Sequence, residues 1–173
     1  MRLVPSFIVG GLLVVTPAVV FAQQPNDAQI AAIVVTANQV DIDAGKLAES
    51  KAMSADVKAF GRQMATDHAG VNKQATDLVT KLGVKPEDNA TAQSLKAGGA
   101  DNVKALSAMS GAAFDKAYID HEVAYHQQVL DAVDKTLIPS AQNAELKALL
   151  IKVRPAFAAH LEHAKHVQHA IAK

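Results

Sequence analysis

The 173-residue sequence contains no cysteine and no tryptophan, and its aromatic residues amount to two tyrosines and five phenylalanines. The absence of cysteine excludes disulfides, thiolate metal ligands, thiol nucleophiles and a lipid attached to a processing cysteine. Any chemistry in this chain therefore depends on histidine, aspartate, glutamate and the backbone. The scarcity of aromatic residues, together with abundant alanine, favours closely packed helices over β-strands.

The sequence also lacks an excess of charge of either sign. Lysine plus arginine and aspartate plus glutamate number 17 each, and Arg2 alone of these lies in residues 1–22, so the rest of the chain carries a formal net charge of −1. This balance gives no reason to expect binding to nucleic acid or to an anionic membrane surface. Phosphate-binding glycine loops and nucleophile motifs are absent as well. The sequence therefore names no catalytic residue and favours a protein that is not an enzyme.

One long apolar run is present, at the amino terminus. Arg2 precedes an almost wholly apolar stretch that ends in Ala22, the kind of small residue that signal peptidases require. We predict a signal peptide over residues 1–22, cleavage after Ala22, and a periplasmic or secreted domain over residues 23–173 that does not insert into the membrane. An uncleaved anchor is the alternative, but prolines and glycines interrupt the run, which is short beside the roughly 20 residues of a spanning helix.

Four long segments carry apolar residues at helical spacing, from about residue 27 to 52, 54 to 82, 110 to 138 and 140 to 171. The stretch between the second and third is too long for a tight turn, and it looks like two helical parts split by Gly98-Gly99. Short, long and short connections predict an all-α, ferritin-like four-helix bundle with a long helical crossover between helices two and three. A simple up-down-up-down bundle with a flexible long loop is the alternative.

Prolines mark where we expect helices to end or bend. Gly83 with the following Pro86 should end the second segment, and Pro139 should end the third, so that Ser140 begins the fourth. Pro155 lies inside the fourth segment and should kink it. Such a kink either turns His160 inward or curves the helix around the core.

Three glycines interrupt the apolar patterns of the helical segments: Gly45, Gly61 and Gly70. Glycine lowers the stability of a helix interior relative to alanine. We therefore expect close approach between helices at these positions.

Four motifs occur in order along the chain: Asp-Ile-Asp-Ala-Gly-Lys-Leu-Ala at 41–48, Asp67-His68, Phe114-Asp115 with Tyr118 and His126, and Pro155 with His160-Leu161. In these motifs the chain, over roughly residues 27–168, resembles a family of bacterial exported ferritin-like domains of unknown function that are often labelled outer membrane proteins. The resemblance implies a ferritin-like fold and export, and it implies no activity. Members of that family usually have glutamate where this chain has Asp41.

Each of the four segments carries an ionisable residue on or beside its apolar stripe: Asp41, His68, Glu122 with His126, and His160. Their distances from the nearest turns allow all five to share one central layer. Three imidazoles and two carboxylates suit a divalent transition metal such as iron, manganese, copper or zinc. The Glu-x-x-His pairs of di-iron bundles are missing, so we do not expect ferroxidase chemistry.

The same five residues also have a purely structural interpretation. Asp41 with His68, and Glu122 with His160, could satisfy each other's hydrogen bonds and fix the register of the helices. Two functions therefore stay open. One is an exported bundle that holds one or two metal ions for storage, sensing or delivery. The other is a non-catalytic envelope or stress-related protein that acts through protein partners or as a homo-oligomer.

Histidines recur near the carboxyl end, where His163, His166 and His169 follow His160 at intervals of three. A step of three residues advances 300° around a helix, so adjacent members alone share a face. These histidines could gather metal loosely at the surface.

Overall fold

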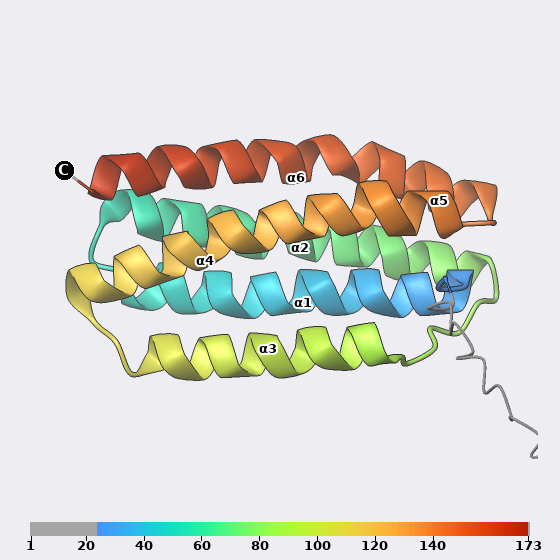
Figure 1. Cartoon of the computed structure of the whole chain (residues 1–173), viewed down its shortest axis with the longest axis horizontal. Helices are drawn as coiled ribbons and strands as arrows, with labels where there is room; N and C mark the ends of the chain where they lie inside the picture. Colours follow the sequence, from blue (N-terminus) through green and yellow to red (C-terminus); the bar gives the residue numbers. More distant parts are fainter. Residues whose placement is uncertain (1–23, 173) are drawn as a thin grey trace, which may run out of the picture.

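The structure is a computed structural model that describes residues 24–172, so the expected signal peptide lies outside the described residues. All regular structure in this range is helical, as predicted. The elements are α1 (Asp27–Lys51), α2 (Ala55–Lys81), α3 (Ala90–Ser107), α4 (Gly111–Ala132), a π-helical turn η1 (Val133–Leu137), α5 (Ile138–Ser140) and α6 (Ala144–Ile171). The long helices lie side by side as a bundle (Figure 1). None of the helices within residues 24–172 combines the length and apolar character needed to cross a membrane.

The direction of each helix follows from the path of the chain in Figure 1. Helices α1 and α2 run in opposite directions, as do α4 and α6, whereas α2 and α4 run the same way. A parallel pair needs a connection that returns along the bundle, and α3 provides it by packing along α1. The helical bundle is thus present, while its ferritin-like affiliation stays a prediction.

Helix α3 is continuous, so the prediction that Gly98-Gly99 splits it was wrong. Gly99 is buried against α1, and a Cβ atom at this position would lie 2.6 Å from a methyl carbon of Val40. Glycine therefore lets α3 approach α1 closely, and here it serves packing rather than a break in the helix.

The junction before α6 also differs from the expectation. Pro139 does not end the helical run, which continues through η1 and α5 to Ser140, and α6 begins after Asn143 instead. A proline inside a helix removes one backbone hydrogen bond, and its ring crowds the carbonyl four residues earlier. The wider π turn covers those residues, and the Ile138 amide donates to the Val133 carbonyl within it. Further along, α6 continues through the exposed Pro155.

Helices α1 and α2 touch through their backbones at Gly45 and Gly61. A Cβ atom on Gly45 would lie 2.6 Å from the Gly61 carbonyl oxygen, and one on Gly61 would lie 2.7 Å from that of Gly45. The expected close approach is therefore confirmed at these two positions. It was wrong for Gly70, which is exposed and would meet no atom within 4 Å.

Two carboxylates, one at each end of the bundle, connect the α1–α2 hairpin with the α4–α6 hairpin. Asp27, in the first turn of α1, accepts hydrogen bonds from the backbone amides of Gln142 and Asn143 at 2.9 Å each. Asp115, near the start of α4, accepts from the amides of Met53 and Ser54 at 2.9 and 2.7 Å. Each helical hairpin therefore supplies an acceptor for the turn of the other hairpin.

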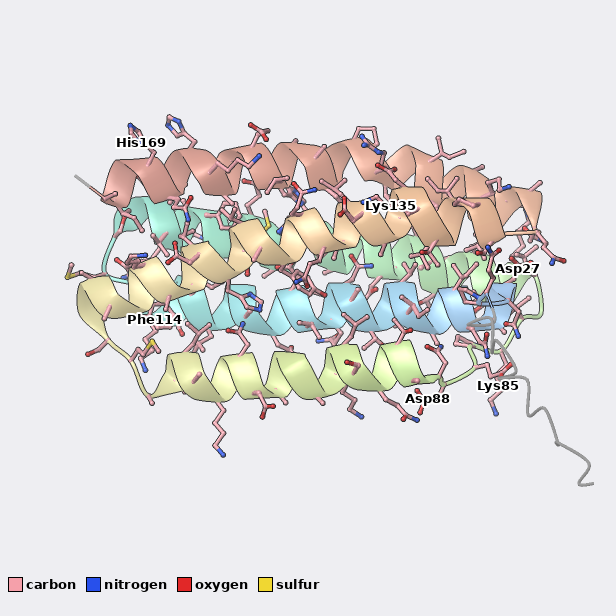
Figure 2. All side chains as sticks on the ribbon, in the orientation of Figure 1. Asp27, Lys85, Asp88, Phe114, Lys135 and His169 are labelled. Atoms are coloured by element: carbon pink, nitrogen blue, oxygen red, sulfur yellow. The ribbon has the colours of Figure 1, made fainter. Side chains whose placement is uncertain are left out.

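Side chains fill the space between the helices (Figure 2). The buried apolar ones form two clusters. One cluster contains Val71 and Phe157, and the other contains Met64 and Ala164. On α2 and α6 the buried histidines stand in sequence between members of the two clusters. The polar layer is therefore enclosed by apolar packing on both sides along the bundle.

Candidate metal centre

The five predicted ligands meet in the interior of the bundle, and none of them is more than 3 % exposed: Asp41, His68, Glu122, His126 and His160. We call this set the central layer. Ligand-type atoms of the three histidines lie within 4.8 Å of one another, and so do those of Asp41, Glu122 and His126. The structure thus brings the five side chains together from α1, α2, α4 and α6, and their role as metal ligands stays a prediction.

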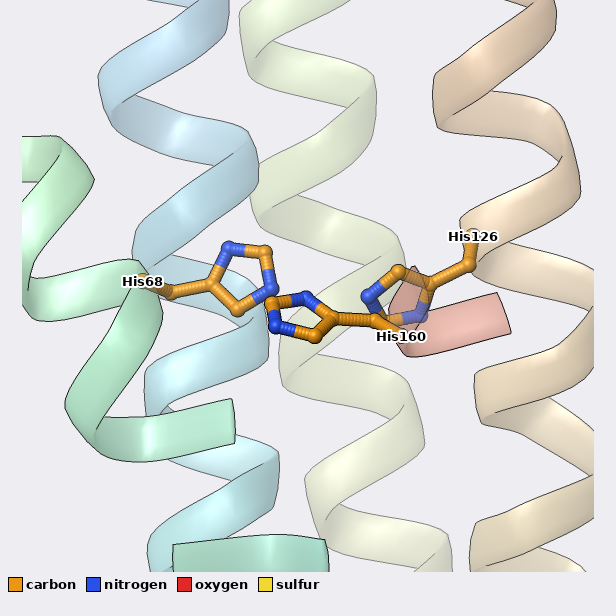
Figure 3. A group of neighbouring side chains, drawn as sticks. All are labelled: His68, His126 and His160. Carbon is orange, nitrogen blue, oxygen red and sulfur yellow. The ribbon is translucent and has the colours of Figure 1, made fainter. Parts of the chain in front are cut away.

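The three imidazole rings meet between the helices (Figure 3), and their centroids form a nearly regular triangle. The ring centroids are separated by 5.6 Å between His68 and His126, 5.2 Å between His68 and His160, and 5.5 Å between His126 and His160. The rings come from three helices and point toward one another. This convergence at one depth is what a shared ion requires.

Asn38 sets the orientation of the His68 ring. The Nδ1 atom of His68 lies 2.6 Å from Oδ1 of Asn38, while Nδ2 of Asn38 donates to the carbonyl of Val34 at 2.8 Å. Because the amide oxygen can only accept, Nδ1 of His68 carries the proton. When the ring is neutral, its Nε2 atom presents a lone pair to the interior, where it has no hydrogen-bond partner among the described residues.

The other two rings are held in the same way. Nδ1 of His126 lies 3.0 Å from the backbone carbonyl of Glu122, and Nε2 of His160 lies 3.0 Å from Oδ2 of Asp67. Within residues 24–172 the opposite nitrogens, Nε2 of His126 and Nδ1 of His160, have no partner. Metal-binding histidines use one nitrogen for the ion and donate from the other to an oxygen, and all three rings fit this description.

The distances from Asp41 to two of the rings are those expected between two ligands of one metal ion. Its Oδ2 atom is 3.0 Å from Nε2 of His68 and 3.4 Å from Nε2 of His126, without the geometry of a hydrogen bond. Two ligand atoms that are each about 2.1 Å from one ion stand about 3.0 Å apart at a right angle and about 3.4 Å apart at the tetrahedral angle. The separations around Asp41 therefore match those of ligands on one ion.

Burial and neighbouring charges set the protonation of the central layer. Burial raises the pKa of Glu122 well above its usual value, and the charge of Asp41 adds to this. Burial also favours the neutral form of Asp41, but His68 and His126 outweigh it and hold the pKa of Asp41 below its usual value. Burial lowers the pKa of His126 to about 4 and also lowers the pKa of His160. The last two rings are thus neutral near pH 7, the form that binds metal.

The supporting residues were the part that sequence reasoning missed. Asn38 stands three residues before Asp41, a spacing that places both on one helix face, and this was the available signal. Asp67 was noticed as a neighbour of His68 but was not connected with His160. The expected contact of Asp41 with His68 is present, whereas His160 approaches Asp67 rather than Glu122.

The carboxyl-terminal histidines lie apart from this layer. His163 contacts the side-chain oxygen of Gln63 at 3.0 Å, and His166 and His169 are exposed. Within the part of the chain that the structure describes, they belong to neither group of residues that could hold an ion.

Comparison with known protein families gives one finding. The model of a family described as "Domain of unknown function (DUF4142)" matches residues 16–167, a range that contains the whole central layer. No curated protein and no solved structure matches the chain.

Proposed function

We propose that the chain, which belongs to the DUF4142 family of domains of unknown function, binds a divalent transition metal ion in its central layer. The observation that carries the proposal is the set of inward-facing atoms without partners. Three ring nitrogens and the carboxylate oxygens of Asp41 and Glu122 are buried together in this state.

A purely structural layer would satisfy these atoms. A buried polar group without a partner costs about 1–3 kcal/mol, more if charged, so several of them in one place require compensation. When His68 and His126 donate outward from Nδ1, their Nε2 atoms carry no proton. Both Nε2 atoms then present lone pairs to Oδ2 of Asp41. A cation between these atoms replaces repulsion between lone pairs with attraction.

The ligand chemistry suits iron, manganese, copper or zinc. Imidazole and carboxylate together bind these borderline ions, and no thiolate is present to favour softer ones. Both groups of candidate ligands include His126, whose Nδ1 atom is used for the Glu122 carbonyl. Because Nε2 alone remains free on that ring, the two groups describe a single ion.

The fold and the compartment are part of the same proposal. We infer a ferritin-like affiliation, supported by the opposed hairpins α1–α2 and α4–α6 and by the helix that joins them along the bundle. We also infer export to the periplasm or the medium, supported by the sequence of residues 1–22. Cell fractionation with amino-terminal sequencing tests the second point. A mature chain that begins at Gln23 is expected, and retention of Met1 in the cytoplasm would contradict export.

Metal analysis of protein purified without an affinity tag tests metal binding. We expect one ion per chain as isolated or after titration with Zn²⁺, Mn²⁺, Fe²⁺ or Cu²⁺. His68→Ala and His126→Ala should abolish stoichiometric binding, whereas His166→Ala and His169→Ala should leave it unchanged. A chain that cannot be loaded, and that is merely destabilised by the first two substitutions, would support the structural interpretation.

A further inference from the structure

We propose that a cavity beside the central layer binds a small, uncharged and mostly apolar organic molecule and brings its single polar end to the metal ion. This inference rests on the proposed function, because the polar end needs the ion as its partner. It adds a second ligand to the site and states its chemical class.

The cavity connects the central layer with the surface. Its volume is about 190 Å³, and at its inner end it is lined by Asp41, His68 and His126. At the opposite end it is lined by exposed residues, Thr91 at the start of α3 and Ala132 at the end of α4. A small molecule therefore has a route from the solvent between α3 and α4 to three of the five candidate ligands.

The arrangement of the helices accounts for this opening. Helix α3 packs along α1 but makes few contacts with α4, and the two diverge toward the end that carries α5 (Figure 1). The π turn η1 lies at the same end and contributes Val133 and Leu137 to the lining. Turns of this type recur at functional sites because they alter the direction of the side chains they carry.

The walls of the cavity select an apolar occupant. Most of the lining is aliphatic or aromatic, including Leu95, Val129 and Phe157, and neither lysine nor arginine is among the lining residues. An anion would thus lack a counter-charge along these walls. An engineered apolar cavity of roughly 150 Å³ holds benzene, so the space here suits a ring of that size with a small substituent.

At the inner end of the cavity, the metal ion is the one polar partner left for the occupant. The Tyr125 hydroxyl, which also lines the cavity, donates to the carbonyl of Ala37 at 2.9 Å, and Asn38 is held by Val34 and His68. The remaining polar atoms are those of the candidate ligands. Since Glu122 and His160 do not line the cavity, an occupant meets the ion on the side formed by Asp41, His68 and His126. One donor atom at the end of the molecule is therefore what the geometry accommodates.

Phenol and benzene, added to protein loaded with Co²⁺, test this inference. Phenol carries one donor on an apolar ring and is uncharged near pH 7, and Co²⁺ reports its ligands through visible absorption. We expect phenol to bind and to change the Co²⁺ spectrum. Benzene should compete with phenol without producing that change, since it fills the cavity but offers no donor.

Two variants and a matched control locate the binding. Ala132→Phe and Thr91→Phe place a ring at the mouth from opposite sides and should weaken phenol binding by about tenfold or more. Ala124→Phe introduces the same ring on an exposed position of α4 that does not line the cavity, and it should leave the affinity unchanged. The Co²⁺ content should be the same in all three proteins.

The outcomes separate the two proposals. Failure to take up Co²⁺ overturns the proposed function, and this inference with it, before any phenol is added. Uptake of Co²⁺ without phenol binding overturns this inference alone. Equal phenol affinity in the Ala132→Phe, Thr91→Phe and Ala124→Phe proteins overturns it as well, because binding would then lie outside the cavity.

Discussion

Asn38 and His68 form the shortest of the contacts that orient the three histidines, with 2.6 Å between Oδ1 and Nδ1. The amide is itself fixed, because its nitrogen donates to the carbonyl of Val34 one turn earlier on α1. The direction of the His68 lone pair is thus determined by a residue that does not face the proposed ion. Supporting residues of this kind contribute to metal affinity through the ligand that they orient.

Replacing Asn38 should therefore weaken metal binding without removing a ligand. We expect Asn38→Ala to lower the affinity about 10- to 100-fold, because the ring of His68 loses its fixed orientation. Competition with a chelator measures this. Gln39→Ala, on the exposed side of the same helix, is the control and should bind as tightly as the parent protein. Equal affinity in the two variants would show that Asn38 has no such role.

Metal binding should release a proton from Glu122. Burial and the charge of Asp41 raise the pKa of this carboxyl well above its usual value, so the metal-free protein favours its protonated form. An ion displaces that proton, and His126 adds none because its pKa is about 4. Calorimetry in buffers of different ionisation enthalpy should report release of about one proton at pH 7. In Glu122→Gln the release should disappear, and its persistence would assign the proton to another group.

The stability of the metal-free protein should fall in acid, in part through His126. Its pKa is about 4 in the fold and ordinarily 6.5, so the unfolded chain takes up the proton first as the pH falls. The contribution of His126 is thus present above pH 6.5 and is lost between pH 6.5 and about 4, at up to about 1.4 kcal/mol per pH unit. The raised pKa of Glu122 acts in the opposite direction, since folding then favours its protonated form.

The variant His126→Gln separates the contribution of His126 to the pH dependence of stability from that of Glu122. Urea unfolding between pH 7 and 5 should show a smaller loss of stability in His126→Gln than in the parent protein, because this side chain takes up no proton. A loss of the same size in both proteins would contradict the role of His126. The lowered pKa of His160 acts in the same direction in both and does not affect the comparison.

Alanine should have opposite effects at two glycines. Gly45→Ala places a methyl group 2.6 Å from the Gly61 carbonyl oxygen, and separating the helices should cost about 1–3 kcal/mol. Gly70→Ala meets no atom within 4 Å and should stabilise the protein by up to about 1 kcal/mol, because alanine favours the helix. Thermal or urea unfolding measures both. Stabilisation by Gly45→Ala would contradict the backbone contact.

Periodicity was sufficient to place the five candidate ligands on inward-facing positions. An apolar stripe fixes which side of a helix is buried, so a histidine or carboxylate on that stripe is buried as well. The contacts between these side chains are harder to predict from the sequence, because they depend on how each helix is rotated and on the rotamers that result. The pairing of His160 with Asp67 rather than Glu122 is of this kind.

Glycine and proline gave the wrong boundaries because each has more than one structural use. Gly98-Gly99 resembles a break in a helix, yet Gly99 serves the approach of α3 to Val40. Pro139 resembles a stop, yet a π turn carries the helix past it. Neither outcome can be read from local sequence, because the first depends on a residue of another helix and the second on a rare backbone geometry.

The hydrogen bonds from Asp27 and Asp115 make the two hairpins dependent on each other. A fragment that held α1 and α2 alone would leave the amides of Met53 and Ser54 without their acceptor, and the other half would lose the partner of Gln142 and Asn143. The halves are therefore expected to gain their structure in a single cooperative step.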